Sequence, residues 1–152
     1  MAQVKDILIL ADDDEDDRLF FSMAMDGMKK EIELITFNDG EKLLHYKEST
    51  TDVPRLVFLD INMPRLSGLE CLKAIRESST WRDVPVAMYT TSSNELDVAK
   101  AIELRAQVFI VKPLEIKILA DMIEWVMHVD WKNTVLPENQ FLMSEKTWMN
   151  KD

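Results

Sequence analysis

Acidic residues 12–17 directly follow a short apolar run near the N-terminus. A solvated loop can carry this much negative charge, whereas a cation-binding site requires it. Asp60 and Lys112 also follow apolar runs further along the chain, so a suitable fold would bring them to the same place. The carboxylates of Asp12, Asp13 and Asp60 with the Lys112 ammonium carry a net charge of −2, from three negative charges and one positive. Magnesium best fits this set, because it binds a few carboxylate oxygens and keeps room for waters and a phosphate oxygen.

Short continuous apolar runs alternate with helical patterns along the chain. The runs are too short for helices and lack polar alternation, which is typical of strands buried on both faces. The expected strands are Ile7–Leu10, Ile32–Phe37, Leu56–Leu59, Val86–Tyr89 and Val108–Val111, and the expected helices are Leu19–Met25, Glu41–Tyr46, Leu69–Ile75, Leu96–Ala106 and Ile116–Met127. This alternation predicts an α/β fold, a doubly wound five-stranded parallel sheet with helices on both faces.

The carboxyl ends of parallel strands share one edge of the sheet, and doubly wound proteins bind ligands there. Asp12 and Asp13 follow the first expected strand, Asp60 the third, Thr90 the fourth and Lys112 the fifth. We therefore expect these side chains to converge. Glu15, Asp16 and Asp17 are instead expected in the first turn of the following helix, where the helix dipole favours negative charge. Thr90 begins the run TTSS, in which a neighbouring hydroxyl could cap the next helix instead.

Length and composition indicate one domain. The chain has 152 residues and is 47% hydrophobic, enough for a single core. We expect this domain to span residues 1–128, because the apolar pattern fades after that. Residues 129–152 are predicted to form a C-terminal extension without a domain of its own.

The charge and hydropathy of the chain argue against several classes of protein. Its net charge of −10 repels phosphate backbones and anionic membrane surfaces, so we expect no nucleic-acid or membrane partner. Neither a membrane span nor a signal-peptide pattern is evident, which predicts a cytoplasmic protein. The single cysteine, Cys71, and the isolated histidines offer no zinc-ligand spacing.

Over about residues 5–128 the sequence resembles the receiver domain of bacterial two-component response regulators. The motif elements that carry the resemblance are an acidic pair with a following arginine, a D-x-x-M-P-x-x-x-G run, a switch hydroxyl, an aromatic residue and a Lys-Pro pair. They fall on Asp12, Asp13 and Arg18, on Asp60, Asn62, Pro64 and Gly68, and on Thr90, Phe109, Lys112 and Pro113. The family's fold is flavodoxin-like with strand order 2-1-3-4-5. One departure is Arg105, which stands where the family commonly has glycine before the fifth strand.

The resemblance implies a role for each of these residues. Asp60 would be the nucleophile that accepts a phosphoryl group. Asp12, Asp13, Asp60 and the main-chain carbonyl of Asn62 would hold Mg²⁺, and Lys112 would pair with the phosphoryl oxygens. Thr90 and Phe109 would act as the switch, and the peptide bond before Pro113 would be cis.

The resemblance also implies a signalling role. The phosphoryl donor would be a histidine kinase or phosphotransfer protein, and an unknown downstream protein would recognise the surface of the fourth helix, fifth strand and fifth helix. A homodimer would form through the same face. The chain would not be an enzyme beyond its own phosphorylation and dephosphorylation, and it most resembles stand-alone, chemotaxis-like receivers, including a small group that serves phytochrome-type kinases.

Three alternatives remain open from the sequence. A haloacid-dehalogenase-like phosphatase also uses an aspartate nucleophile, but it normally has a second aspartate where this chain has Asn62. A receiver can also serve as a docking or dimerisation module for which phosphorylation is irrelevant. The third alternative keeps the chemistry but makes the protein a phosphorelay intermediate or a phosphate sink.

Overall fold

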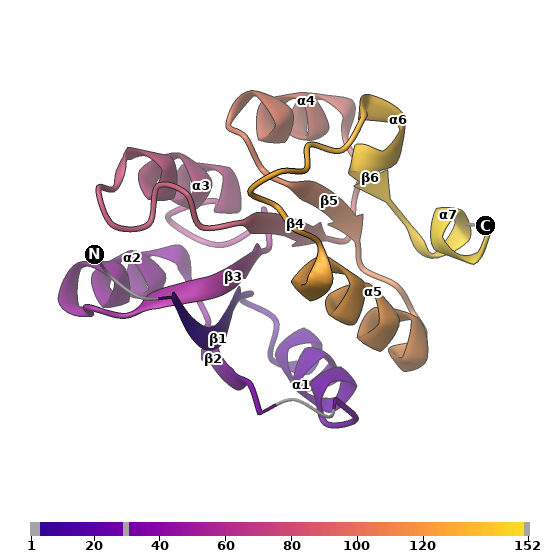
Figure 1. Cartoon of the computed structure of the whole chain (residues 1–152), viewed down its shortest axis with the longest axis horizontal. Helices are drawn as coiled ribbons and strands as arrows, with labels where there is room; N and C mark the ends of the chain where they lie inside the picture. The colour runs from indigo at the N-terminus through magenta and orange to yellow at the C-terminus, as the bar shows by residue number, and fades with distance from the viewer. Residues whose placement is uncertain (1–3, 29–30, 151–152) are drawn as a thin grey trace.

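The computed structural model describes residues 4–28 and 31–150 and contains one sheet in which all the strands run parallel (Figure 1). The strands pair in the order β2-β1-β3-β4-β5-β6. Their bounds are Val4–Ala11 for β1, Glu33–Phe37 for β2, Val53–Leu59 for β3, Val86–Thr90 for β4, Val108–Val111 for β5 and Leu142–Met143 for β6. The predicted doubly wound, flavodoxin-like fold is therefore confirmed, with the first five strands in the expected order.

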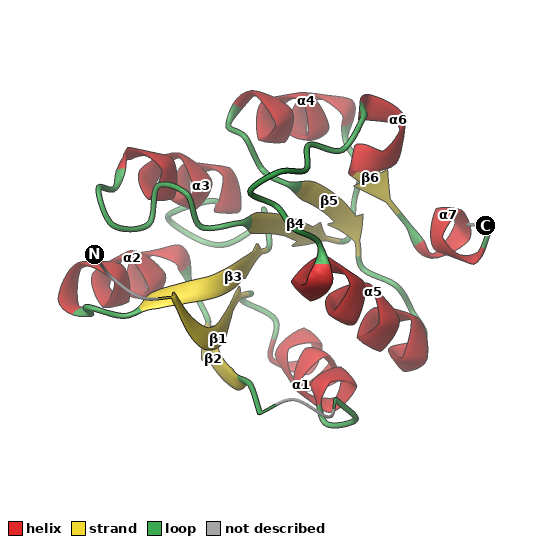
Figure 2. Cartoon of the chain, in the orientation of Figure 1, coloured by secondary structure: helices red, strands yellow, loops and turns green. Residues whose placement is uncertain are grey.

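Helices cover both faces of the sheet (Figure 2). Their bounds are Glu15–Met25 for α1, Gly40–Ser49 for α2, Gly68–Glu77 for α3, Glu95–Glu103 for α4, Ile116–His128 for α5, Glu138–Phe141 for α6 and Glu145–Met149 for α7. Helices α1 and α5 pack on one face, over a core that includes Leu8 and Leu10 of β1. Helices α2, α3 and α4 pack on the other, over a core that includes Ile7 and Ile9. Successive residues of β1 thus face opposite cores, as continuous apolar runs predict.

Side-chain caps fix the starts of the helices next to the sheet edge. Asp14 accepts a hydrogen bond from the main-chain N–H of Asp17 and caps α1, so that Glu15, Asp16 and Asp17 form its first turn, ahead of the apolar pattern that begins at Leu19. Ser67 forms a capping box with Glu70 at the start of α3. These caps define where the loops after β1 and β3, which hold the acidic residues, end and the helices begin.

The prediction of five strands is wrong, because the sheet has a sixth strand. The sixth strand, β6, comes from the C-terminal extension and pairs with β5, so that Phe109 lies opposite Leu142 and Ile110 opposite Met143. A strand of two residues is too short to give an apolar period, which explains why the sequence pattern fades there. Phe141, directly before β6, is buried and joins the core on the α4 side of the sheet.

The turn between α4 and β5 is made without glycine. Arg105 has a φ of 67°, in the left-handed region that favours glycine. The N–H of Arg105 donates to the carbonyl of Ile102 and the N–H of Ala106 to that of Ala101, which together form a Schellman motif. The buried guanidinium of Arg76 donates a 2.8 Å hydrogen bond to the Arg105 carbonyl and so holds the turn in place.

Within residues 4–28 and 31–150, every helix is too short or too polar to span a membrane.

Candidate functional site

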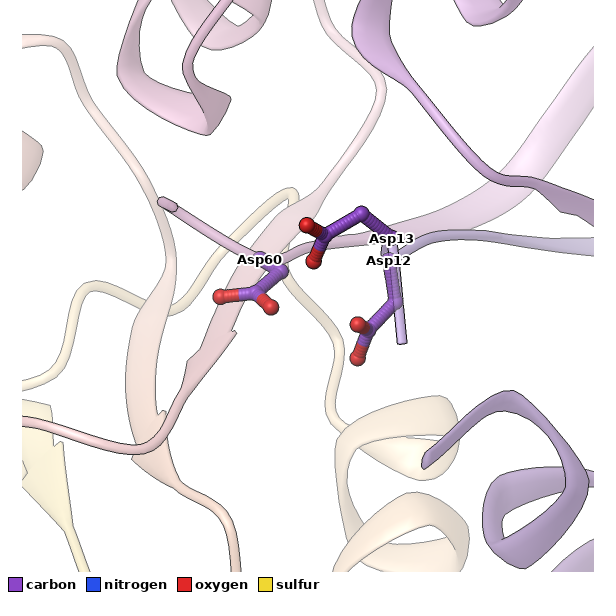
Figure 3. Close-up of side chains that lie close together, drawn as sticks. All are labelled: Asp12, Asp13 and Asp60. Carbon is purple, nitrogen blue, oxygen red and sulfur yellow. The ribbon is translucent and has the colours of Figure 1, made fainter. Parts of the chain in front are cut away.

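The residues that follow β1 and β3 meet at the carboxyl-terminal edge of the sheet, as predicted. One carboxylate oxygen from each of Asp12, Asp13 and Asp60 lies within 4.8 Å of the other two. Figure 3 shows Asp12 and Asp13 on the chain that leaves β1 and Asp60 on the chain that leaves β3. Asp12 and Asp60 are buried, whereas Asp13 is exposed. The acidic run therefore contributes two carboxylates, those of Asp12 and Asp13, to this group of candidate metal ligands.

Asp12 is the most deeply buried acid of the cluster, with 0% of its surface exposed. Burial raises its pKa to about 6, although a hydrogen bond from Lys112 opposes this effect. Its Oδ1 accepts a 3.0 Å hydrogen bond from the main-chain N–H of Asp14. Arg18 donates a 2.8 Å hydrogen bond to its main-chain carbonyl, which explains the arginine that follows the acidic pair. Asp12 is thus fixed in place before any ligand binds.

Lys112 projects into the same cluster from the end of β5. Its Nζ lies 2.7 Å from Asp12 Oδ2, 2.8 Å from Asp17 Oδ2 and 3.1 Å from Asp60 Oδ2. Burial opposes the charged form of Lys112, but hydrogen bonds to Asp12 and Asp17 outweigh it and raise the lysine pKa. Sequence reasoning missed Asp17, because its place in the first turn of α1 already explained its charge through the helix dipole.

Asp60 is held by its main chain at a point where two loops approach closely. Its N–H donates a 2.9 Å hydrogen bond to the carbonyl of Ala11 at the end of β1. Gly68, at the start of α3, packs so near that a Cβ there would overlap the main-chain oxygen of Asp60. The glycine of the D-x-x-M-P-x-x-x-G run therefore serves this close approach of backbone to backbone.

The two expected switch residues lie on neighbouring strands. Thr90 ends β4 and is completely buried, and its Oγ1 has no hydrogen-bond partner among the described residues. A buried hydroxyl without a partner is rare and calls for an explanation. Phe109, on β5, is also completely buried, and its ring centre lies 6.5 Å from that of Phe141. The C-terminal extension therefore covers the aromatic switch position.

Two expectations about the surrounding loops have different outcomes. Asn62 lies two residues beyond Asp60 and is exposed, and the role of its main-chain carbonyl as a metal ligand stays a prediction. The expected cis peptide bond before Pro113 is wrong, because the described chain contains no cis peptide bond. The trans form is favoured by about 0.5–1 kcal/mol for peptide bonds that precede proline, so it needs no special support here.

The cluster fits a hard divalent cation. Three carboxylates offer oxygen ligands within a space of 4.8 Å, which suits Mg²⁺, and no soft sulfur or imidazole ligand competes among the described residues. The exposed Asp13 leaves one side of the cluster open to solvent, where a metal that keeps several waters can be accommodated. Burial that raises the pKa of Asp12 also favours a cation, because metal binding compensates the buried negative charge.

Comparison with known proteins identifies the family. The model of the response regulator receiver domain matches residues 8–124, and the chain therefore belongs to this family. Response regulator Rcp1 of Synechocystis sp. is 27% identical over 134 residues, which covers 85% of this chain and 90% of that protein. The Mn(2+)-bound form of Rcp1 has a similar structure, with a TM-score of 0.72, 26% identity and coverage of 86% of this chain and 98% of that one. A bacteriophytochrome response regulator, RtBRR, gives a TM-score of 0.70 at 29% identity and covers 97% of this chain and 90% of its own.

Family membership confirms the resemblance and the cofactor. Receiver domains bind Mg²⁺ at this acidic pocket, and they belong to signalling proteins of two-component systems. Receiver domains are phosphorylated by histidine kinases, and the phosphorylation of an aspartate is general in the family. The dehalogenase-like phosphatase is therefore no longer needed as an explanation of the aspartate cluster.

Proposed function

We propose that this receiver accepts a phosphoryl group on Asp60 and signals through a protein-binding surface that depends on its phosphorylation. The observation that best supports this role is the surroundings of the Asp60 carboxylate. It lies 3.1 Å from the Lys112 ammonium and beside the acids Asp12 and Asp13. Thr90 ends β4 at the same edge of the sheet, and its buried hydroxyl has no hydrogen-bond partner among the described residues. The same edge thus supplies a nucleophile, a cation, metal ligands and a free hydrogen-bond donor.

In the transfer step, a carboxylate oxygen of Asp60 attacks phosphorus and forms an acyl phosphate. The bond from phosphorus to the donor nitrogen breaks, and its electron pair leaves with the imidazole of a phosphohistidine. Lys112 is placed to neutralise charge on the phosphoryl oxygens, which is where such transfers are assisted most. Asp12, Asp13 and Asp60 would hold Mg²⁺, which supplies further neutralisation of phosphoryl charge when bound.

The switch would use the two residues that lie next to the site. The Thr90 hydroxyl can donate to a phosphoryl oxygen and so satisfy a buried group that has no partner among the described residues. A shift of Thr90 would change the space beside β5, where Phe109 and Phe141 pack together. We therefore place the phosphorylation signal on α4, β5 and the extension that covers β5.

The extension changes the surface that a partner would meet. In this chain the outer edge of β5 pairs with β6, so a partner at the α4-β5-α5 face would contact β6 and α6 rather than an open strand. A homodimer through this face would form over the same elements. Light scattering of the unmodified and phosphorylated protein would show whether such a dimer forms.

The similarity to bacteriophytochrome response regulators suggests a phytochrome-type histidine kinase as the donor, acting in the cytoplasm. Transfer from such a kinase would distinguish a cognate pair from nonspecific chemical phosphorylation, because cognate transfer is faster at low kinase concentration. Rapid return of the phosphoryl group to a second histidine protein would favour the relay or phosphate-sink role.

The phosphoacceptor role is tested by intact-protein mass spectrometry after incubation with acetyl phosphate and Mg²⁺. We expect one phosphoryl adduct on the wild type, and none on Asp60→Asn or in excess chelator. Asp13→Asn should lower the yield without changing the position of the adduct. No adduct on the wild type, even with a phosphohistidine donor, would refute the proposal and favour a docking module that is independent of phosphorylation.

A further inference from the structure

The Lys112 ammonium is surrounded by three carboxylates. It has three N–H donors, and one oxygen each of Asp12, Asp17 and Asp60 lies 2.7, 2.8 and 3.1 Å from its Nζ. Tyr89 packs beside it, with its ring centre 5.4 Å from Nζ. The lysine side chain is 8% exposed, so water cannot readily replace a lost partner. The position of the ammonium therefore depends on these carboxylates.

Two of the three carboxylates have other tasks in the proposed reaction. Asp12 would bind the metal, and Asp60 would carry the phosphoryl group, so both would weaken their hold on Lys112 during the reaction. Asp17 has neither task, and it reaches the lysine from the first turn of α1. The longest of the three distances is the one to the acceptor Asp60, which leaves Asp12 and Asp17 as the closer contacts.

We propose that Asp17 is a positioning residue that anchors the Lys112 ammonium beside Asp60 while the metal and the phosphoryl group occupy the other two carboxylates. This inference rests on the proposed function, since it concerns how Lys112 assists phosphoryl transfer. Asp17 touches neither the phosphoryl group nor the metal in this account. Its effect on the rate must therefore pass through Lys112.

The chain offers a matched control for this role. Asp16 lies in the same first turn of α1, is exposed, and would lose the same charge on replacement by asparagine. Both Asp16→Asn and Asp17→Asn change the charge near the start of α1 equally, but only Asp17→Asn weakens a contact to Lys112. We expect Asp17→Asn to slow adduct formation by about two- to fivefold, the range of a partly exposed ion pair, and Asp16→Asn to leave the rate within error of the wild type.

Two further measurements separate positioning from a general structural effect. Asp17→Glu keeps the carboxylate and should recover most of the rate lost in Asp17→Asn. In the Lys112→Met background, Asp17→Asn should slow adduct formation no more than Asp16→Asn does, because the group that Asp17 positions is absent. If Lys112→Met forms no adduct at all, the rescue by Asp17→Glu still tests the role.

A readout without metal or phosphoryl donor tests the contact itself. In excess chelator, the urea midpoints of Asp17→Asn, Lys112→Met and the double variant should be non-additive, because the two side chains interact directly. Additive midpoints would overturn the pairing.

The phosphorylation rates decide the proposal. An Asp17→Asn rate equal to that of Asp16→Asn would overturn it, and a faster rate would mean that Asp17 competes for the ammonium instead of anchoring it. An adduct that fails to form on the wild type would instead refute the proposed function, so the two failures are distinguishable.

Discussion

Asp12→Asn should stabilise the metal-free protein at neutral pH, although it removes one of the proposed metal ligands. The Asp12 side chain is completely buried, and burial raises its pKa from 3.8 to about 6. A group whose pKa is higher in the folded than in the unfolded protein stabilises the fold fully below its unfolded pKa. That contribution is lost as the pH rises towards the folded pKa. Ionised Asp12 therefore destabilises the metal-free fold above about pH 6.

The size of the effect follows from the two pKa values. The difference between 3.8 and about 6 corresponds to about 3 kcal/mol at neutral pH, at 1.36 kcal/mol for each pH unit. Asparagine keeps an oxygen for the N–H of Asp14, but it loses the charge that pairs with Lys112. The pKa of about 6 already includes the attraction of Lys112, so Asp12→Asn, which resembles the neutral acid, should stabilise the metal-free fold by about 3 kcal/mol near neutral pH.

Urea unfolding in excess chelator, at about pH 4.5 and about pH 7.5, measures this effect. The wild type and Asp12→Asn share every other titrating group, so the difference between their unfolding free energies reports the Asp12 charge together with its interactions with Lys112 and Asp60. The advantage of the variant should be larger by about 2 kcal/mol at the higher pH. Mg²⁺ should then stabilise the wild type at neutral pH and affect the variant much less. A variant that is less stable at neutral pH, or an advantage independent of pH, would show that the Asp12 charge does not destabilise the metal-free fold.

Three further predictions follow from local geometry. Gly68→Ala should lower the unfolding free energy by about 1–3 kcal/mol and slow adduct formation, because the alanine Cβ would push against the main chain of Asp60. An unchanged urea midpoint and an unchanged rate of adduct formation would contradict this prediction. Arg105→Gly should raise the unfolding free energy by about 1 kcal/mol, because glycine adopts the left-handed backbone conformation of Arg105 without strain. Thermal unfolding measures this gain, and a lower unfolding midpoint in the variant would contradict the prediction. Phe141→Ala should lower the unfolding free energy by about 3 kcal/mol, or it should release the extension and so accelerate hydrogen exchange at the Phe109 amide. An unchanged unfolding free energy together with an amide at Phe109 that stays protected would contradict the packing of Phe141 on Phe109.

Much of the fold could be predicted because its strands are buried on both faces. Continuous apolar runs such as Leu56–Leu59 and Val108–Val111 can form few other structures, and each lies within an observed strand. Helix starts were less predictable. Apolar spacing alone indicates a start at Leu19. The preference of acidic residues for a first helical turn extends α1 back to Glu15, where the Asp14 cap begins it.

The acidic cluster could be predicted because the topology of a parallel sheet brings strand ends together. Asp12, Asp13 and Asp60 converge as the spacing indicated, but this convergence does not by itself establish the role of each. The contact between Asp17 and Lys112 joins residues 95 positions apart, and it depends on how α1 lies against the sheet edge. No local pattern encodes that packing.

The C-terminal extension was the least predictable part. Strand β6 exists because β5 offers an open edge, and a pair of residues can form a strand there without any periodic pattern. Phe141 belongs to the core only because β6 places it beside Phe109. Its burial is a tertiary consequence and has no signal in the sequence around it.

Phosphorylation of Asp60 is tested most directly by locating the phosphoryl group chemically. Protein treated with acetyl phosphate and Mg²⁺ is reduced with borohydride, which converts an acyl phosphate of aspartate to homoserine, and the residue is found by peptide mass spectrometry. The account predicts homoserine at position 60 in the treated protein, and none when chelator is present. Homoserine at position 12 or 13, or a phosphate on the Thr90 hydroxyl that survives the reduction, would contradict it.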